Sequence, residues 1–349
     1  MHIARRNAVG RVLVAVVVIV LVGLSGLAFV LYEQTSIKPS TVSLSLDFTP
    51  NPGDAPLFYG VAQGIYKQNH INLTIIPGTS VNAAIASLEA GDVNFALVAP
   101  SSVVDYVAKN NVTNIQIVAM EYARGTLVVI YNNASISTIS DLNGKSGSMV
   151  SPSAGDVRGD FQLFANANGL NTSSMSIQYN PVSTSDDLLL TGKVQFIVAS
   201  VQNLATVQSA GSTSGLKFGY FAMSDNGFNS AGIAIATTES MIQQNPGVVR
   251  DFVKATMQSL VSAYANQTGA VADLVSANPD LNETASLQGY RTLLSCCSMN
   301  PGNLTNPLQY GWINPQFMQQ TVNNEIIADN LGITLNATTI YTNEFVQQP

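Results

Sequence analysis

The side chains best suited to bind a small molecule stand at the points where predicted strands end. The first such point is LDFTPNPGDAP, residues 46–56. A strand cannot extend its ladder through the prolines of this stretch, because proline has no backbone N–H. The chain must therefore leave the sheet at its carboxyl edge. This makes the stretch a pocket wall, with Asp47, Phe48 and Asn51 as its candidate ligand contacts.

Hydroxyl side chains recur at the other predicted strand ends, and several of these ends lead directly into a helix. Exposed backbone N–H groups and the positive end of the helix dipole would then face a ligand. The three serines among these residues also fit the role of plain N-caps, which contribute about 1 kcal/mol each. The candidate contacts at these ends are Ser80, Ser101, Tyr122, Ser153 and Gly155.

The sequence offers little for catalysis or metal binding. The two histidines are His2, near the N-terminus, and His70, at the end of a predicted surface helix, so a catalytic triad would depend on His70. The stretch Gly144–Ser146 lacks the first glycine of a phosphate loop, because Ile139 stands in that place. No Cys, His and carboxylate group has metal-ligand spacing. We therefore expect a binding protein with no catalytic residue, no metal and no cofactor.

The two cysteines, Cys296 and Cys297, are neighbours in the sequence. A disulfide between neighbours is strained and rare. We therefore expect two small buried apolar side chains near a helix end, and no disulfide.

Strands and helices alternate from residue 42 onward, which is typical of a mostly parallel sheet with helices on both faces. The predicted strands are 42–48, 72–76, 95–99, 115–122, 127–131, 146–150, 176–179, 196–199 and 232–237. The predicted helices are 57–69, 80–90, 101–109, 139–142 (a short turn), 155–168, 185–190 and 246–264.

The alternation restarts at Gly125, so the chain contains two α/β units. We expect residues 43–125 to form a first lobe and 126–220 a second lobe, with 221–349 returning to the first lobe as a helical C-terminal part. Two such units predict a two-lobed α/β clamshell. Ligands of such folds bind between the lobes, outside the carboxyl ends of the strands.

The N-terminus predicts the compartment. Residues 12–32 are uncharged and apolar and follow three arginines; as a helix this stretch would span about 30 Å, the thickness of a bilayer core. Because arginines stay on the cytoplasmic side, residues 1–11 are expected inside the cell and the remainder outside. We expect an uncleaved transmembrane signal anchor followed by a tether, residues 33–42. A cleaved signal peptide is the alternative, although its apolar core is normally about 7–15 residues.

Composition and charge limit the classes of partner that the chain could bind. Charged residues make up only 10% of the chain and the formal net charge is −7. No basic run exists beyond the extreme N-terminus, which argues against a nucleic-acid partner. Eight Asn-x-Ser/Thr sequons fit an extracellular glycoprotein. They begin at Asn72, Asn111, Asn133, Asn171, Asn266, Asn282, Asn303 and Asn336.

Four segments together resemble one family. LDFTPNPGDAPLFYGVAQGIYKQNHINLTI resembles the opening of the thiamine-pyrimidine-precursor binding proteins. ISDLNGKSGSM and LLLTGKVQFIVAS are similar to the family's second-lobe segments, NPGVVRDFVKATMQSLVSA to its long helix, and YTNEFV to its tail. The resemblance runs from about residue 44 to residue 346. The middle segments are shared with binding proteins for sulfonates, nitrate and riboflavin.

The resemblance implies a type II periplasmic-binding-protein-like clamshell that delivers a pyrimidine precursor of thiamine to an ABC permease, as a monomer with no chemistry of its own. Asp47, Phe48 and Asn51 match the opening motif, Tyr59 falls near its aromatic residue, and Asn203 lies in the run after the second-lobe strand. An aromatic ring at position 48 could stack on a heterocycle, while Asp47 and Asn51 could hydrogen-bond to ring nitrogens or an amino group.

The sequence also departs from the family pattern. Phe48 replaces the usual tryptophan, Asp54 replaces a histidine, and residues 201–206 lack the aromatics and the glutamate that pyrimidine binders carry there. Riboflavin, a sulfonate or nitrate therefore remain alternative ligands. Some eukaryotic relatives are single-turnover pyrimidine synthases that consume their own histidine. This chain has no matching cleft histidine, which argues against that role.

Overall fold

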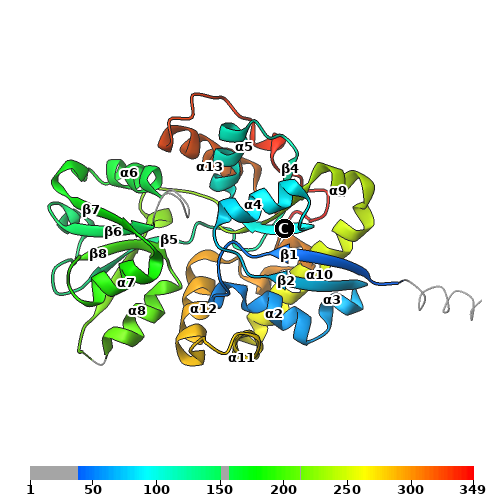
Figure 1. The fold of residues 1–349 in the computed structure, drawn as a ribbon, viewed down its shortest axis with the longest axis horizontal. Helices are drawn as coiled ribbons and strands as arrows, with labels where there is room; N and C mark the ends of the chain where they lie inside the picture. Colours follow the sequence, from blue (N-terminus) through cyan, green and yellow to red (C-terminus); the bar gives the residue numbers. More distant parts are fainter. Residues whose placement is uncertain (1–37, 151–156, 213) are drawn as a thin grey trace, which may run out of the picture. The chain divides into compact units, whose positions relative to one another are not determined.

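The structure is a computed structural model that describes residues 38–150, 157–212 and 214–349. Residues 41–349 form one compact unit, which contains two five-stranded sheets with helices packed on them (Figure 1). The predicted anchor, residues 12–32, lies outside the described residues. Within the described part of the chain, none of the helices combines the length and the apolar character needed to cross a bilayer.

The first sheet has the strand order β2-β1-β3-β10-β4. β1 runs parallel to β3, with Leu44 opposite Phe95, whereas β10 runs antiparallel to β3 and β4. The strands are β1 Ser40–Ser45, β2 Ile71–Ile76, β3 Phe95–Val98, β4 Ile115–Met120 and β10 Ala234–Thr238. The helices from the same parts of the chain are α2 Ala55–Ala62, α3 Ile65–Gln68, α4 Val81–Ala90, α5 Pro100–Asn110, α9 Glu239–Gln244, α10 Pro246–Ala265, α11 Gln267–Ala277, α12 Glu283–Cys297 and α13 Pro315–Ala328.

The second sheet has the order β7-β6-β8-β5-β9. β6 runs parallel to β7 and β8, and β5 runs antiparallel to β8 and β9. Its strands are β5 Leu127–Asn132, β6 Ser146–Val150, β7 Ser176–Asn180, β8 Phe196–Ser200 and β9 Phe218–Ala222, and its helices are α6 Arg158–Ala167, α7 Val182–Leu190 and α8 Asn203–Ser212. Short 3-10 helices are η1 Pro52–Asp54, η2 Ile139–Leu142, η3 Thr172–Ser174, η4 Met223–Asp225, η5 Pro301–Asn303, η6 Pro307–Gln309 and η7 Ala337–Thr339.

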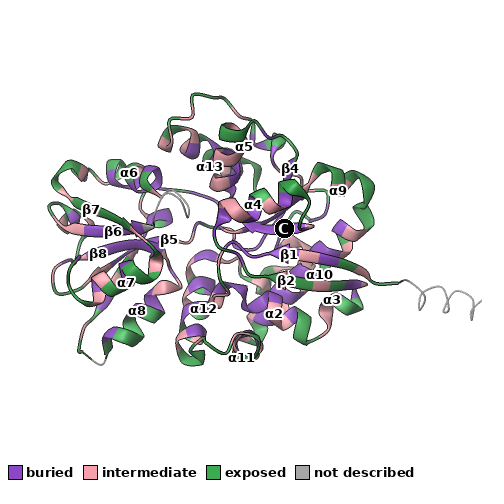
Figure 2. Ribbon diagram, viewed as in Figure 1, coloured by how far each residue is buried: buried purple, intermediate pink, exposed green. Residues whose placement is uncertain are grey.

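The central strands of the first sheet form a buried core on which α10 packs. Every residue of β3 and β4 is buried, as expected for strands covered by helices on both faces. Figure 2 shows this buried centre in purple. Phe95 of β3 stacks on Phe252 of α10 with ring centroids 3.8 Å apart. Burial of one such side chain contributes about 1.5–3 kcal/mol, so this contact holds α10 against the sheet.

Two crossover segments, residues 121–126 and 223–233, join the sheets. Their backbones are hydrogen-bonded, and the N–H of Gly125 donates to the carbonyl of Ser230 at 2.7 Å. A Cβ at Gly232 would lie 2.3 Å from the carbonyl oxygen of Arg124. Only glycine therefore allows the two segments to approach this closely. Residues of both segments line the cleft that is described below.

Several elements match the sequence prediction, and others differ for physical reasons. α10 confirms the helix expected over 246–264. The sheets are mixed instead of mostly parallel, because β5 and β10 each follow a crossover and enter their sheet antiparallel to its other strands. β9 was not predicted, since its sequence FGYFA contains a glycine that weakens a strand signal. The helix expected over 57–69 is broken at Gly64, whose φ is 70°.

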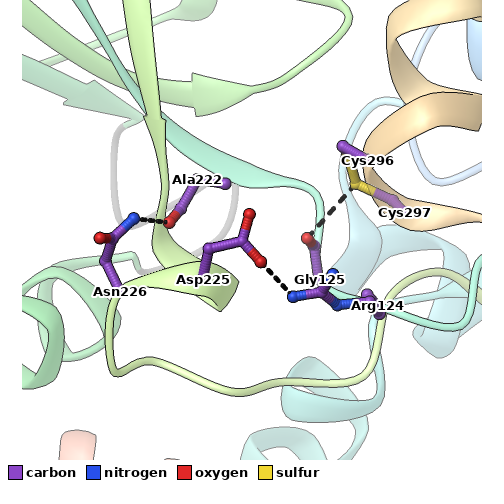
Figure 3. Close-up of polar contacts among 7 residues, drawn as sticks. All are labelled: Arg124, Gly125, Ala222, Asp225, Asn226, Cys296 and Cys297. Atoms are coloured by element: carbon purple, nitrogen blue, oxygen red, sulfur yellow. Dashed lines mark hydrogen bonds and ion pairs between the residues drawn. A yellow bond between two sulfur atoms is a disulfide. The ribbon is translucent and has the colours of Figure 1, made fainter.

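The expectation for the cysteines is wrong. The structure joins Cys296 and Cys297 in a disulfide at the end of α12 (Figure 3). The pairing occurs where α12 ends and the backbone becomes extended at the next residue. Cys297 is buried, as expected, and its Sγ lies 3.6 Å from the carbonyl oxygen of Gly125. Nearby, Arg124 pairs with Asp225 across the two crossover segments.

Candidate functional site

A cleft of about 920 Å³ opens between the two sheets and is lined by residues from both. Its first wall comes from residues 47–54, the start of α5 and the first crossover segment. Its second wall comes from α7 and from the residues between β8 and α8. Both walls are the places where strands end and helices begin, as the sequence predicts for this fold class. Pockets that hold small organic molecules have volumes of about 300–1,000 Å³.

The loop after β1 is held rigidly on the first wall. The side chain of Asn51 accepts a hydrogen bond from the N–H of Gly53 at 2.9 Å, and the N–H of Asn51 donates to Asp54 Oδ2 at 2.8 Å. This is a capping box, which satisfies the free N–H groups of the 3-10 helix. The hydroxyl of Tyr122 donates to the carbonyl of Gly53 at 2.7 Å. The loop therefore has one well-defined shape beside the cleft.

Three carboxylates of the first wall form a buried group, which we call the first-wall acids: Asp47, Asp54 and Glu121. They are 8%, 2% and 1% exposed. Burial raises the pKa of Asp47 to about 6, and burial followed by the nearby charge of Asp47 raises the pKa of Asp54. Burial, then Asp54 and Asp47, raises the pKa of Glu121. Oε1 of Glu121 has no hydrogen-bond partner among the described residues.

The second wall carries one more buried acid, Asp186 of α7, which is 9% exposed. Burial raises its pKa to about 7, while a hydrogen bond from Asn203 lowers it. Its Oδ1 has no hydrogen-bond partner in the part of the chain that the structure describes.

The two walls also touch: Nε2 of Gln202 donates to Asn51 Oδ1 at 3.2 Å. The two walls are therefore in direct contact through this amide.

A separate group of charges lines the cleft near α5 and α13, and we call it the lysine–carboxylate cluster: Asp105, Lys109, Glu325 and Asp329. Nζ of Lys109 lies 2.5 Å from Asp105 and 3.1 Å from Asp329. Burial, followed by nearby acids of which Asp160 is the strongest, raises the pKa of Glu325 to about 10. The three acids lie close enough together to hold a metal ion. The ammonium group of Lys109 already supplies positive charge there.

The structure brings six of the ten predicted contacts to the cleft. Asp47, Phe48, Asn51, Ser101, Tyr122 and Asn203 line it. Tyr59 does not; its hydroxyl meets Asn266 at 3.4 Å and its ring packs in a hydrophobic cluster. Ser80 caps α4 by accepting a hydrogen bond from the N–H of Ala83, which is its alternative role. Ser153 and Gly155 lie outside the described residues.

Of the cleft acids, sequence reasoning singled out Asp47 as a contact and missed Glu121 and Asp186. Glu121 follows β4 directly, so its position at a strand end was the signal that could have found it. Asp186 lies within a helix, and the sequence alone did not show which side of α7 faces a ligand. His70 is remote from this chemistry: its side chain is 41% exposed, lies 3.9 Å from Asp251, and does not line the cleft.

Comparison with known proteins identifies the family. Residues 51–270 match the family model described as NMT1/THI5 like. The chain belongs to the NMT1/THI5-like family. This match covers most of both walls of the cleft and so agrees with the resemblance seen in the sequence. No curated protein sequence matches the chain.

Solved structures share the fold of this NMT1/THI5-like chain. The periplasmic aliphatic sulphonate binding protein SsuA from Escherichia coli has a TM-score of 0.67 and 11% identity, over 89% of this chain and 93% of that one. The periplasmic nitrate-binding protein NrtA from Synechocystis PCC 6803 has a TM-score of 0.58 and 11% identity, over 88% and 87%. A Candida albicans gene product described as having the generic periplasmic binding protein fold has a TM-score of 0.61 and 16% identity, over 89% and 98%. The predicted periplasmic-binding-protein fold is thus confirmed.

Proposed function

We propose that this protein is the solute-binding component of an ABC-type importer and captures a small planar heterocycle, such as a pyrimidine precursor of thiamine, between its two walls. The binding step involves no chemistry by the protein itself. The observation that carries the proposal is the combination on the first wall of Phe48 with the first-wall acids. An aromatic face and adjacent carboxylates suit a flat ring that bears amino or ring N–H donors.

The charge of the cleft favours this ligand over the anions bound by two of the structural neighbours. A sulfonate or nitrate needs cationic or N–H-rich surroundings. Six buried carboxylates line this cleft instead: Asp47, Asp54, Glu121, Asp160, Asp186 and Glu325. The sequence argument counted the loss of a glutamate after β8 against an aminopyrimidine. Asp186 supplies a carboxylate on the same wall.

Calorimetry on the full chain in a non-ionic detergent tests the proposal. The ligand is 4-amino-5-hydroxymethyl-2-methylpyrimidine, and its matched control is the same ring without the amino group. We expect the amino compound to bind more tightly and, at 100 times its Kd, to stabilise the fold by about 2.7 kcal/mol. Riboflavin, an alkanesulfonate and nitrate are titrated in parallel. Tighter binding of any of these three would replace the aminopyrimidine as the ligand class.

The contribution of the aromatic ring is tested by Phe48→Leu, which keeps apolar volume but removes the stacking face. Stacking contributes about 0.5–1.5 kcal/mol beyond buried area, so we expect the amino compound to bind roughly threefold to tenfold more weakly. Tyr59→Leu removes an aromatic ring outside the cleft and should leave the affinity unchanged. Equal losses in both variants would show that Phe48 acts through the fold and not through the ligand.

We propose a cell-surface arrangement for the same function. Residues 12–32 anchor the chain, residues 33–42 are the tether, and the segments 43–125, 126–220 and 221–349 form the external clamshell, which meets its permease as a monomer. The apolar stretch and its preceding arginines support this topology. Full-length protein should stay with membranes in high salt, whereas a chain beginning at Thr41 should not. Release of the full-length protein from membranes would contradict the anchor.

A further inference from the structure

Each wall of the cleft presents a buried carboxylate oxygen that lacks a hydrogen-bond partner among the described residues. On the first wall this is Oε1 of Glu121, directly after β4, and on the second wall it is Oδ1 of Asp186, in α7. Both residues line the cleft, and both are more than nine-tenths buried. Buried polar groups in folded proteins are almost always paired. Among the described residues that line the cleft, Asp105 has a third such oxygen, but Nζ of Lys109 lies 2.5 Å from it. The two oxygens on opposite walls have no such cation and point to partners that a ligand brings.

The surroundings of both oxygens raise the free-energy cost of leaving them without a hydrogen-bond partner. A carboxylate removed from water without a partner is strongly destabilised in its charged form. On the first wall, Asp47 and Asp54 add negative charge beside Glu121. On the second wall, Asp187 adds negative charge beside Asp186, while a hydrogen bond from the side chain of Asn203 favours its ionised form. Each wall is therefore short of positive charge.

The cations of the cleft are committed to other groups. Lys109 lies between Asp105 and Asp329 in the lysine–carboxylate cluster. The guanidinium of Arg158 lies over the ring of Tyr179, 5.8 Å from its centroid. Among the described residues, no ion pair reaches Asp47, Asp54, Glu121 or Asp186. Within the described part of the chain, these acids are left to be neutralised by protons or by a ligand.

We propose that the ligand carries a positively charged or N–H-donating nitrogen at each of two ends, one held by Glu121 and the other by Asp186. This inference rests on the proposed function, because it takes the cleft as the ligand site, and it adds the class of ligand: a diamine, or an amino-substituted heterocycle with a second basic nitrogen. Such a ligand joins the walls, because each end is recognised by a different sheet. The cleft volume of about 920 Å³ has room for a ring that carries two such groups.

The test uses three probes built on one benzene ring: p-xylylenediamine with two ammonium groups, benzylamine with one, and benzenesulfonate with none. Each is titrated by calorimetry at pH 7.5 into the full chain in non-ionic detergent. The variants are Glu121→Gln and Asp186→Asn, which keep shape and remove charge. The matched control is Asp187→Asn, which removes the same charge from the next residue, an exposed one that does not line the cleft.

We expect the diamine to bind the native protein at least tenfold more tightly than benzylamine, and benzenesulfonate to bind most weakly. Glu121→Gln and Asp186→Asn should each reduce the affinity for the diamine to about that for benzylamine, while Asp187→Asn, which removes only a charge beside the site, should reduce it far less. Far-UV circular dichroism and thermal unfolding establish that each variant is folded. If Glu121→Gln fails to fold, Asp186→Asn decides the test alone.

Three outcomes would overturn the inference: no measurable diamine binding, tighter binding of benzenesulfonate, or an unchanged diamine affinity in Asp186→Asn. These are separable from failure of the proposed function. If the aminopyrimidine binds and the diamine has no advantage, the two-ended site is wrong while the heterocycle proposal stands. If the diamine binds as expected and no heterocycle does, the heterocycle proposal is wrong while the two-ended site stands.

Discussion

Two groups of acids line the same cleft, and among the described residues only one of them has a lysine of its own. In the lysine–carboxylate cluster, Lys109 contacts Asp105 and Asp329 directly. The first-wall acids and Asp186 have no such partner in residues 38–150, 157–212 and 214–349. The charge of the first group is therefore partly neutralised by a lysine of the protein. The second group has no lysine among the described residues and is left to be neutralised by protons or by a ligand. This difference underlies our proposal that the second group binds the ligand.

The two groups also lie on different structural supports. The lysine–carboxylate cluster joins α5 to α13, two helices that pack together. The first-wall acids lie on the loop after β1 and on the start of the first crossover segment, at the edge of the sheet where ligands of this fold class bind. A group that only stabilised the protein would not need this edge. Its position is the second reason to assign it to the ligand.

The largest expected change comes from removing the internal cation with Lys109→Met. Asp105 and Asp329 would then lose their ion pair with Lys109, which destabilises a buried group strongly and a half-exposed one less. Since Lys109 is 52% exposed, we expect a loss of about 2 kcal/mol in the free energy of unfolding at pH 7, measured by urea denaturation. Lys193→Met, at an exposed lysine, should change it by less than about 0.5 kcal/mol. Equal losses of stability in Lys109→Met and Lys193→Met would show that Lys109 does not stabilise the lysine–carboxylate cluster.

The reverse change gives the second wall a cation of its own. In Asn203→Lys, an ammonium group replaces the amide that hydrogen-bonds to Asp186. We expect it to neutralise that acid and to weaken binding of p-xylylenediamine about tenfold, which corresponds to about 1.4 kcal/mol. Asn203→Gln keeps an amide donor and should retain binding within about threefold. Undiminished binding to Asn203→Lys would show that Asp186 does not hold the ligand.

A pH-dependent change is expected at Glu325. Its folded pKa of about 10 lies above its ordinary value of 4.5, so the folded state keeps a proton that the unfolded state loses as pH rises. Stability from this group is fully present below about pH 4.5 and is lost progressively as pH rises towards 10. Glu325→Gln removes this dependence. The variant should gain about 1.4 kcal/mol relative to the native protein between pH 6 and pH 7 in urea unfolding; parallel stability curves would contradict the protonated state of Glu325.

Part of this site could be predicted from the sequence. The prolines after Asp47 force the chain out of the sheet, so Asp47, Phe48 and Asn51 were placed at the cleft correctly. Strand ends also placed Ser101 and Tyr122. Their position at the cleft could be predicted because strand ends and proline positions are local features of the chain; their role as ligand contacts stays a prediction.

The remaining features depend on contacts between distant segments. Asp186 was missed because a helix position does not reveal which neighbour the helix faces. The lysine–carboxylate cluster was missed because it joins residues 105–109 to residues 325–329. The antiparallel strands were missed because they follow chain crossings that the alternation of strands and helices cannot show. Tyr59 was placed by its likeness to a family aromatic, and the packing of α2 turns it away from the cleft.

The central claim is that the buried acids of the cleft bind a positively charged ligand. Proton release on binding tests this claim most directly. Burial raises the pKa of Asp186 to about 7 and that of Asp47 to about 6, so at pH 6.5 each carries a proton part of the time. A cation favours the ionised forms, and p-xylylenediamine itself stays charged, as amines do at this pH. Calorimetry at pH 6.5 in two buffers of different ionisation enthalpy should show net proton release, with affinity falling from pH 7.5 to pH 5.5. No proton exchange, or proton uptake, would contradict the claim that these acids receive the ligand.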